Sequence, residues 1–131
     1  MVGRPRPTVV VSEDEPEIRE LLVLVLERAD LRVVAVGDGR EVLEALEGGL
    51  LPDLLLLDLH TPRLDAVGVM AGLEARGGSP CPVLVMSGGA GALEAFPAGV
   101  VQGFVSKPFD VGRLIGQIAQ LLGRARPERS G

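Results

Sequence analysis

The sequence contains few aromatic residues, one cysteine and one histidine. Aromatic side chains make up 2% of the 131 residues, namely three Phe with no Tyr and no Trp, and this excludes a stacking surface for single-stranded nucleic acid. Cys81 has no partner for an internal disulfide, and one Cys with one His cannot build a zinc site. Because no disulfide framework is possible, we expect a protein of the cytoplasm.

Long hydrophobic runs and an excess of positive charge are also missing. The longest apolar runs, such as residues 21–26, are much shorter than the roughly 20 residues of a membrane span. Residues 8–11 lead directly into acidic residues, so we expect no secretory leader and no membrane contact. A formal net charge of −5 disfavours binding to a nucleic-acid backbone. The hydrophobic share of 47% is enough for one domain with an aliphatic core.

Five short apolar runs alternate with segments of helical periodicity. The runs are rich in Val or Leu without polar alternation, which is typical of strands buried on both faces; they span residues 8–12, 32–36, 54–57, 83–86 and 103–106. Apolar residues recur at helical spacing in residues 18–29, 42–46, 66–76 and 111–122. This alternation predicts an α/β fold with a parallel sheet between two helical layers. The common order for five such strands is 2-1-3-4-5.

An aspartate precedes four of the expected helices, where it is a candidate N-cap: Asp14, Asp38, Asp65 and Asp110. The first two have a Glu three residues later, which is the spacing of a capping box. The segment between the fourth and fifth strands is different, because the glycine-rich residues 88–91 leave only five residues before Pro97. Each interior glycine costs a helix about 0.8–1.0 kcal/mol relative to Ala. We therefore expect a short or irregular fourth helix.

Polar side chains lie where the expected strands end. Glu13 and Asp14 follow the first strand, Asp58 ends the third and Ser87 the fourth, and Lys107, the only lysine, ends the fifth. In a 2-1-3-4-5 sheet, ligands bind at this edge, between the first and third strands. The three carboxylates repel one another, and Lys107 with a hard cation such as Mg²⁺ would balance them. The set suits phosphoryl transfer, with Asp58 as the nucleophile.

Four stretches resemble motifs of the receiver domain of two-component response regulators. They occur in the family's order: VVSEDEP at residues 10–16, PDLLLLDLHTP at 52–62, PVLVMS at 82–87 and FVSKPF at 104–109. The likeness spans residues 8–122 and implies a flavodoxin-like receiver fold. Residues 1–7 are then an N-terminal extension, and residues 123–131 a C-terminal tail.

The resemblance also implies a role for each acidic residue of the motifs. Asp58 matches the phosphoacceptor, and Glu13 and Asp14 match the acidic pair that binds Mg²⁺ in the family. His60 lies where the family offers a backbone carbonyl to the metal ion. These matches imply a magnesium-dependent phosphorylation site.

Further matches concern the contacts of the phosphoryl group and the switch. Ser87 and Lys107 match the hydroxyl and the ammonium that contact the phosphoryl group, and Gly88 would contribute a backbone contact. Phe104 matches the aromatic residue whose rotamer follows phosphorylation, so Ser87 and Phe104 are the expected switch residues. The Lys107–Pro108 bond matches one that is usually cis in the family.

By this resemblance, a histidine kinase or phosphotransfer protein donates a phosphoryl group from phosphohistidine to Asp58, which changes the domain's contacts with a downstream protein. We expect no enzymatic activity beyond the protein's own phosphorylation and dephosphorylation, and no contact with nucleic acid. The sequence fits a stand-alone receiver and a piece of a longer regulator or hybrid kinase equally well.

Three alternatives were weighed against this interpretation. The departures at residues 88–97 keep open a degenerate receiver that only docks. A phosphohydrolase of the haloacid-dehalogenase type is disfavoured because His60 stands where that class has a second Asp. A flavin mononucleotide site is disfavoured because the acids at 13–15 would repel its phosphate.

Overall fold

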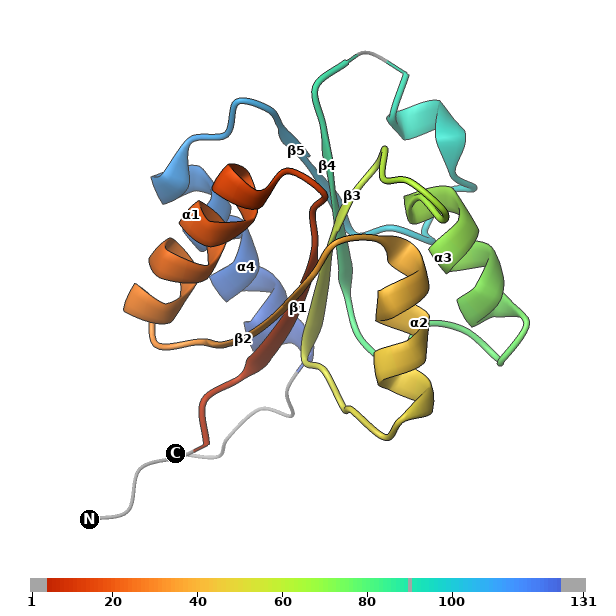
Figure 1. Cartoon of the computed structure of the whole chain (residues 1–131), viewed down its shortest axis with the longest axis horizontal. Helices are drawn as coiled ribbons and strands as arrows, with labels where there is room; N and C mark the ends of the chain where they lie inside the picture. The colour runs from red at the N-terminus through yellow and green to blue at the C-terminus, as the bar shows by residue number, and fades with distance from the viewer. Residues whose placement is uncertain (1–4, 90, 126–131) are drawn as a thin grey trace.

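Five parallel strands form a central sheet in the order β2-β1-β3-β4-β5, in a computed structural model that describes residues 5–89 and 91–125 (Figure 1). The elements along the chain are β1 (Thr8–Ser12), α1 (Pro16–Arg28), β2 (Arg32–Val36), α2 (Gly39–Glu47), β3 (Leu54–Asp58), α3 (Ala66–Glu74), β4 (Val83–Ser87), the 3₁₀ helix η1 (Leu93–Ala95), β5 (Gly103–Ser106) and α4 (Val111–Ala125). The predicted strand order and the expected short fourth helix are confirmed. The expected terminal extension and tail lie mainly outside the described residues.

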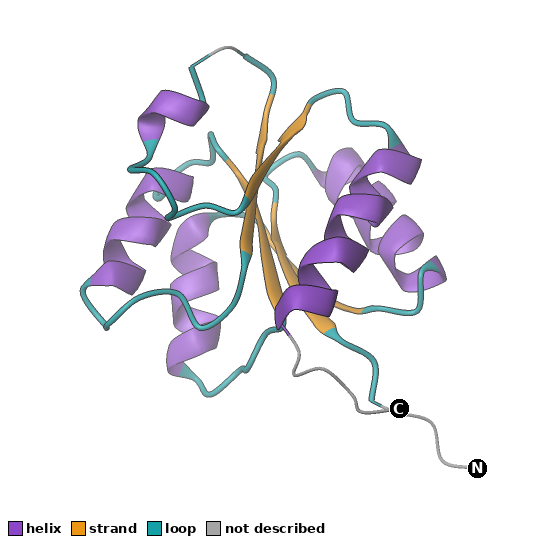
Figure 2. Cartoon of the chain, turned by 180° about the vertical axis from the view of Figure 1, so that it is seen from behind, coloured by secondary structure: helices purple, strands orange, loops and turns teal. Residues whose placement is uncertain are grey.

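The sheet is covered by helices on both faces, with α1 and α4 on one side and α2 and α3 on the other (Figure 2). Along β1, Val9 and Val11 pack in the core on the first side and Val10 packs on the second. Every residue of β3 and β4 is buried, which explains why the strand sequences do not alternate. Among the described helices, none is both long and apolar enough to span a membrane.

Three of the four predicted N-caps are confirmed by hydrogen bonds to the third residue of the helix. The carboxylate of Asp38 accepts from the Glu41 amide, Asp65 from Gly68 and Asp110 from Arg113. The fourth candidate N-cap, Asp14, is wrong, because α1 begins one residue later, after Glu15, without a side-chain cap. Pro16 removes one of the free amides at that helix end, and the Asp14 carboxylate lies with other acids instead.

The helix α2 and the loop after β3 meet at Gly39. Its amide donates to the carbonyl of Leu64 at 2.9 Å. A Cβ at this position would lie 2.4 Å from a methyl group of Val69 and 2.6 Å from the Leu64 carbonyl oxygen. Gly39 is therefore required for this approach, which fixes the loop that runs from Asp58 to α3.

We expect Gly39→Ala to lower the free energy of unfolding by about 2–3 kcal/mol, because the overlap is with backbone and with a buried side chain. Gly116→Ala is the matched control: this glycine lies inside α4 with open space around its Cβ position. The control should gain up to about 1 kcal/mol from helix propensity. Urea unfolding of both variants measures the difference, and equal stabilities would contradict the close approach at Gly39.

Candidate functional site

Lys107 forms two ion pairs at the carboxyl ends of the strands. Its Nζ donates to Glu13 Oε1 at 2.9 Å and to Asp58 Oδ2 at 3.1 Å. The three residues follow β1, end β3 and follow β5, so the strand order brings together positions 49 and 94 residues apart. Glu13 is fully buried and Asp58 nearly so. The peptide bond between Lys107 and Pro108 is cis, as the resemblance implies.

Burial and charge act in opposite directions on these groups. Burial raises the pKa of the Glu13 carboxyl above its ordinary value, and the hydrogen bond from Lys107 only partly offsets this. Burial alone would lower the pKa of Lys107, but the hydrogen bonds and charges of Glu13 and Asp58 outweigh it and raise that pKa. The ammonium of Lys107 is therefore held in its charged form.

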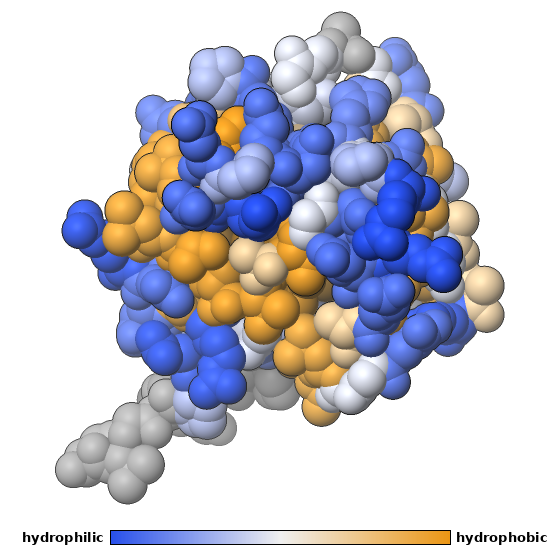
Figure 3. Space-filling model, in the orientation of Figure 1, coloured by the Kyte–Doolittle hydropathy of each residue, from blue (hydrophilic) through white to orange (hydrophobic). Residues whose placement is uncertain are grey.

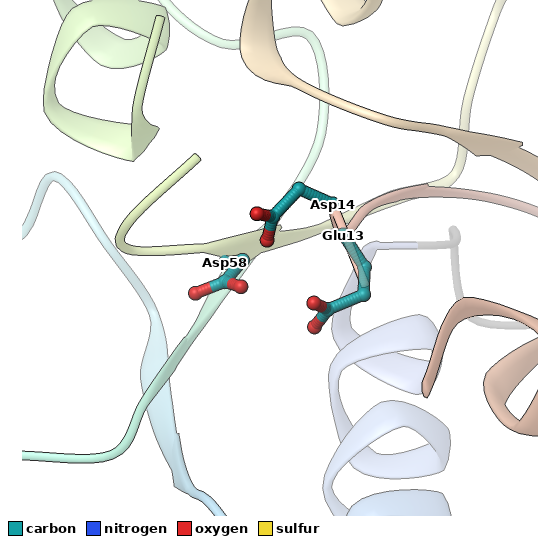
Figure 4. Close-up of side chains that lie close together, drawn as sticks. All are labelled: Glu13, Asp14 and Asp58. Carbon is teal, nitrogen blue, oxygen red and sulfur yellow. The ribbon is translucent and has the colours of Figure 1, made fainter. Parts of the chain in front are cut away.

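Three carboxylates lie close together at this edge (Figure 4). Glu13, Asp14 and Asp58 each offer an oxygen, and these atoms all lie within 4.8 Å of one another. Lys107 balances only one of the three negative charges, so the cluster carries an excess of negative charge. Oxygen donors with an exposed member, Asp14, fit a hard divalent cation that keeps some of its water.

The backbone around the acids is held by hydrogen bonds. The Glu13 amide donates to the carbonyl of Val36 at 3.0 Å, and Arg19 Nη1 on α1 donates to the Glu13 carbonyl at 2.8 Å. The sequence-based predictions gave Arg19 no role. The available signal was its position one turn into the helix that follows the acids. Arg19 fixes the peptide that connects the two acidic residues.

The other predicted residues lie around this cluster. The amide of His60 donates to Asp58 Oδ1 at 3.2 Å, and its side chain is exposed. The hydroxyl of Ser87 exchanges two 3.2 Å hydrogen bonds with the backbone of Gly89. Gly88 follows directly, and a Cβ there would lie 3.9 Å from the Lys107 side chain. Phe104 packs against Phe96, with ring centroids 6.1 Å apart.

A further ion pair, between Arg63 and Asp38, fixes the loop between Asp58 and α3. Arg63 Nε donates to Asp38 Oδ2 at 2.7 Å, and Nη2 donates to Oδ1 at 3.3 Å. Arg63 has a left-handed backbone conformation, with φ of 64°. Burial would raise the pKa of Asp38, but the hydrogen bonds from Arg63 and the Glu41 amide hold it below its ordinary value. This contact was not predicted, because the two residues are 25 positions apart.

The family model described as response regulator receiver domain matches residues 9–119. The transcriptional activator protein PfeR of Pseudomonas aeruginosa is 35% identical over 131 residues, which cover 98% of this chain and 42% of the relative. The chain spans about half the length of the curated relatives it matches.

Solved structures show the same fold. A sensor protein from Polaromonas sp. JS666 has a TM-score of 0.80 and 28% identity, over 93% of this chain and all of the other. The receiver domain of the sensor histidine kinase PA1611 of Pseudomonas aeruginosa, described with a magnesium ion in its active-site cleft, has a TM-score of 0.78. It is 21% identical, over 90% of this chain and 98% of that one.

We expect Asp38→Ala to lower the free energy of unfolding by about 1–2 kcal/mol at neutral pH, because it removes the helix cap along with the ion pair to Arg63. Asp38→Asn is the matched variant: Asn caps as well as Asp, so only the partly exposed ion pair is lost, for about 0.2–1 kcal/mol.

The pH dependence separates the two contributions. Because the folded-state pKa of Asp38 lies below the ordinary value of 3.8, its stabilising charge is present above that value and is lost as pH falls through the folded pKa. The gap between wild type and Asp38→Asn should therefore close as the pH falls from 3.8 through the lower folded-state pKa of Asp38. A constant gap across the acid range in thermal melts would contradict the ion pair's contribution.

Proposed function

This chain belongs to the response regulator receiver domain family, and on that premise we propose that Asp58 accepts a phosphoryl group in a magnesium-dependent reaction. The observation that carries the assignment is the contact of Lys107 with both Glu13 and Asp58. The proposed domain spans residues 8–122. The family places it in two-component signalling, where receiver domains interact with histidine kinases or phosphotransfer proteins.

The acidic cluster is the proposed magnesium site. Glu13, Asp14 and Asp58 would hold the ion together with the backbone carbonyl of His60. The magnesium ion in the active-site cleft of the PA1611 receiver supports this choice. When bound, the ion supplies positive charge that neutralises the transferring phosphoryl oxygens. The chain's own part is to present the ligands at a fixed spacing, which the hydrogen bonds to Val36 and Arg19 maintain.

The chemistry proposed for Asp58 is attack of a carboxylate oxygen on phosphorus. The new O–P bond replaces the N–P bond of a phosphohistidine, and the leaving imidazole takes up a proton. The Lys107 ammonium, 3.1 Å from the Asp58 carboxylate, is placed to bind one phosphoryl oxygen. The Ser87 hydroxyl and the Gly88 amide would bind others. We propose no reaction beyond this phosphorylation and its hydrolysis.

The partners follow from the family and from charge. We propose that the phosphodonor is a histidine kinase or phosphotransfer protein in the cytoplasm, and that a downstream protein recognises the phosphorylated form. PfeR is a transcriptional activator, but a net charge of −5 supports no nucleic-acid contact through this domain itself.

The alternatives considered from the sequence are not favoured. The acids and Lys107 of the phosphorylation site are all present and in contact, which a module used only for docking does not need. The position of a hydrolase's second Asp holds His60, whose side chain is exposed.

We expect the wild-type protein to gain one phosphoryl group, on Asp58, from acetyl phosphate when Mg²⁺ is present, and none when the metal is chelated. Asp58→Asn should gain none. Asp110→Asn is the matched control. Asp110 is an exposed aspartate between β5 and α4, and Asn preserves its cap on α4. Intact-mass spectrometry measures the adduct, and equal labelling of Asp58→Asn would show that the acceptor is another residue.

We also expect phosphorylation to order the segment around η1. The three-residue helix is too short to be stable alone. Ser87, which would move toward the phosphoryl group, bonds to Gly89, four residues before η1. Amide hydrogen exchange of residues 91–100 should be fast in the free protein and slow at least about tenfold with beryllofluoride, a phosphoryl mimic. Exchange in the free protein as slow as in β3 would contradict this expectation.

A further inference from the structure

The strand β2 forms one edge of the sheet, and among the described strands its only neighbour is β1. The amide of Arg32 donates to Pro7, and the carbonyl of Val36 accepts from Glu13, so these residues direct their backbone polar groups toward β1. The direction of the backbone amides and carbonyls alternates from one residue to the next along a strand. The amides and carbonyls of Val33 and Ala35 therefore point outward, away from the sheet.

This edge lacks the features that usually protect one. The residues after Arg32 are Val-Val-Ala-Val, with no charge and no proline, and all four are only half-buried. Figure 3, in the orientation of Figure 1, shows apolar surface across the middle of the molecule, between α1 and α2, where β2 lies. At the opposite edge, the Gln117 side chain donates to the Phe104 carbonyl. Among the described residues, no side chain makes such a bond to Val33 or Ala35.

We propose that β2 is an interaction surface for β2 of a second copy of this chain, paired antiparallel about a two-fold axis. An axis perpendicular to the sheet keeps each helical layer on its own side, so opposed residues must face the same layer. This condition holds only in registers where the two opposed residues are both even-numbered or both odd-numbered. Centring the pair on Val34 matches the whole strand and sets Val33 opposite Ala35 of the second copy, where outward amides and carbonyls can exchange hydrogen bonds.

Charge complementarity selects the second copy as the occupant. In this register Arg32 lies opposite Val36 of the second copy, on the side of the sheet that α2 covers, because Val34 and Val36 pack there. An open hollow beside Val36 is lined by Glu41 and Glu44. Glu44 already pairs with Arg40 at 3.6 Å, but both side chains are mostly exposed, at 59% and 64%, so the pair is weak. The Glu44 carboxylate can therefore accept a second cation.

The hollow is lined by two carboxylates and by one cation, Arg19, whose guanidinium also donates to the Glu13 carbonyl. The lining therefore keeps an excess of one negative charge. Two-fold symmetry creates the contact between Arg32 and Glu44 twice, once at each end of the paired strands. A strand from an unrelated protein would supply this reciprocity only by coincidence. The proposal is independent of Asp58 and is tested in unphosphorylated protein.

Charge reversal tests the pairing by sedimentation equilibrium at low salt, from about 10 μM to about 1 mM protein. Wild type should dimerise within this range. Arg32→Glu alone and Glu44→Arg alone should each weaken the dimer at least about tenfold, because every attractive contact becomes repulsive.

An equimolar mixture of the two variants should recover the wild-type dimer, because the mixed pair contains only attractive contacts. This rescue also shows that both variants are folded. Arg113→Glu, an exposed reversal on α4 near the opposite edge, is the control and should dimerise as wild type does.

Three results would overturn the proposal. The first is a wild-type monomer at every concentration. The second is a dimer that neither Arg32→Glu nor Glu44→Arg weakens, or that only Arg113→Glu weakens, which would place association elsewhere. The third is a mixture that stays monomeric. Binding of β2 to some other protein's strand would appear as the first result.

Discussion

The ammonium of Lys107 lies between two buried carboxylates, and the geometry of the strand ends depends on this contact. Taking such charges out of water is unfavourable, and their mutual attraction offsets that penalty only when geometry and further hydrogen bonds are good. Removing Lys107 would leave Glu13, which is fully buried, next to Asp58 without compensation. Well-packed hydrophobic residues in place of a buried ion pair are often as stable, so under the proposed function the charges serve the site's chemistry rather than the fold's stability.

The loops around this contact are attached to one another rather than left free. Arg19 holds the Glu13 carbonyl from α1, and Arg63 joins the loop after Asp58 to the cap of α2. The absence of a side chain at Gly39 lets the same loop approach α2 closely. Together these contacts limit how far the acidic oxygens can move apart, and a preorganised ligand set is what a small divalent cation requires.

Much of this arrangement could be predicted from the sequence because it follows from local patterns. Buried parallel strands are continuous apolar runs, so all five were located, and the order followed from the common topology of such sheets. The apolar residues at helical spacing in 18–29 predict the buried face of α1 only in part, since Leu22 is buried but Leu21 is 43% exposed. Arg19 and Arg63 were missed because their partners are set by tertiary folding. The sequence left two interpretations of Asp14, because an aspartate before a helix fits a cap and a ligand equally well, and the start of α1 after Glu15 excludes the cap.

The position of Ser87 suggests how a change in charge at Asp58 would reach the rest of the domain under the proposed function. A phosphoryl group adds negative charge where Lys107 already compensates two carboxylates, so further donors are needed. The Ser87 hydroxyl is a near donor at the end of the neighbouring strand, but it now bonds to Gly89. Moving it would exchange those bonds for a contact with the phosphoryl group, and this contact would fix the chain that leads to η1, where Phe96 packs on Phe104. Arg19 and Arg63 would still hold the loops after β1 and β3, so the rearrangement would be confined to the segment that leads from β4 to η1.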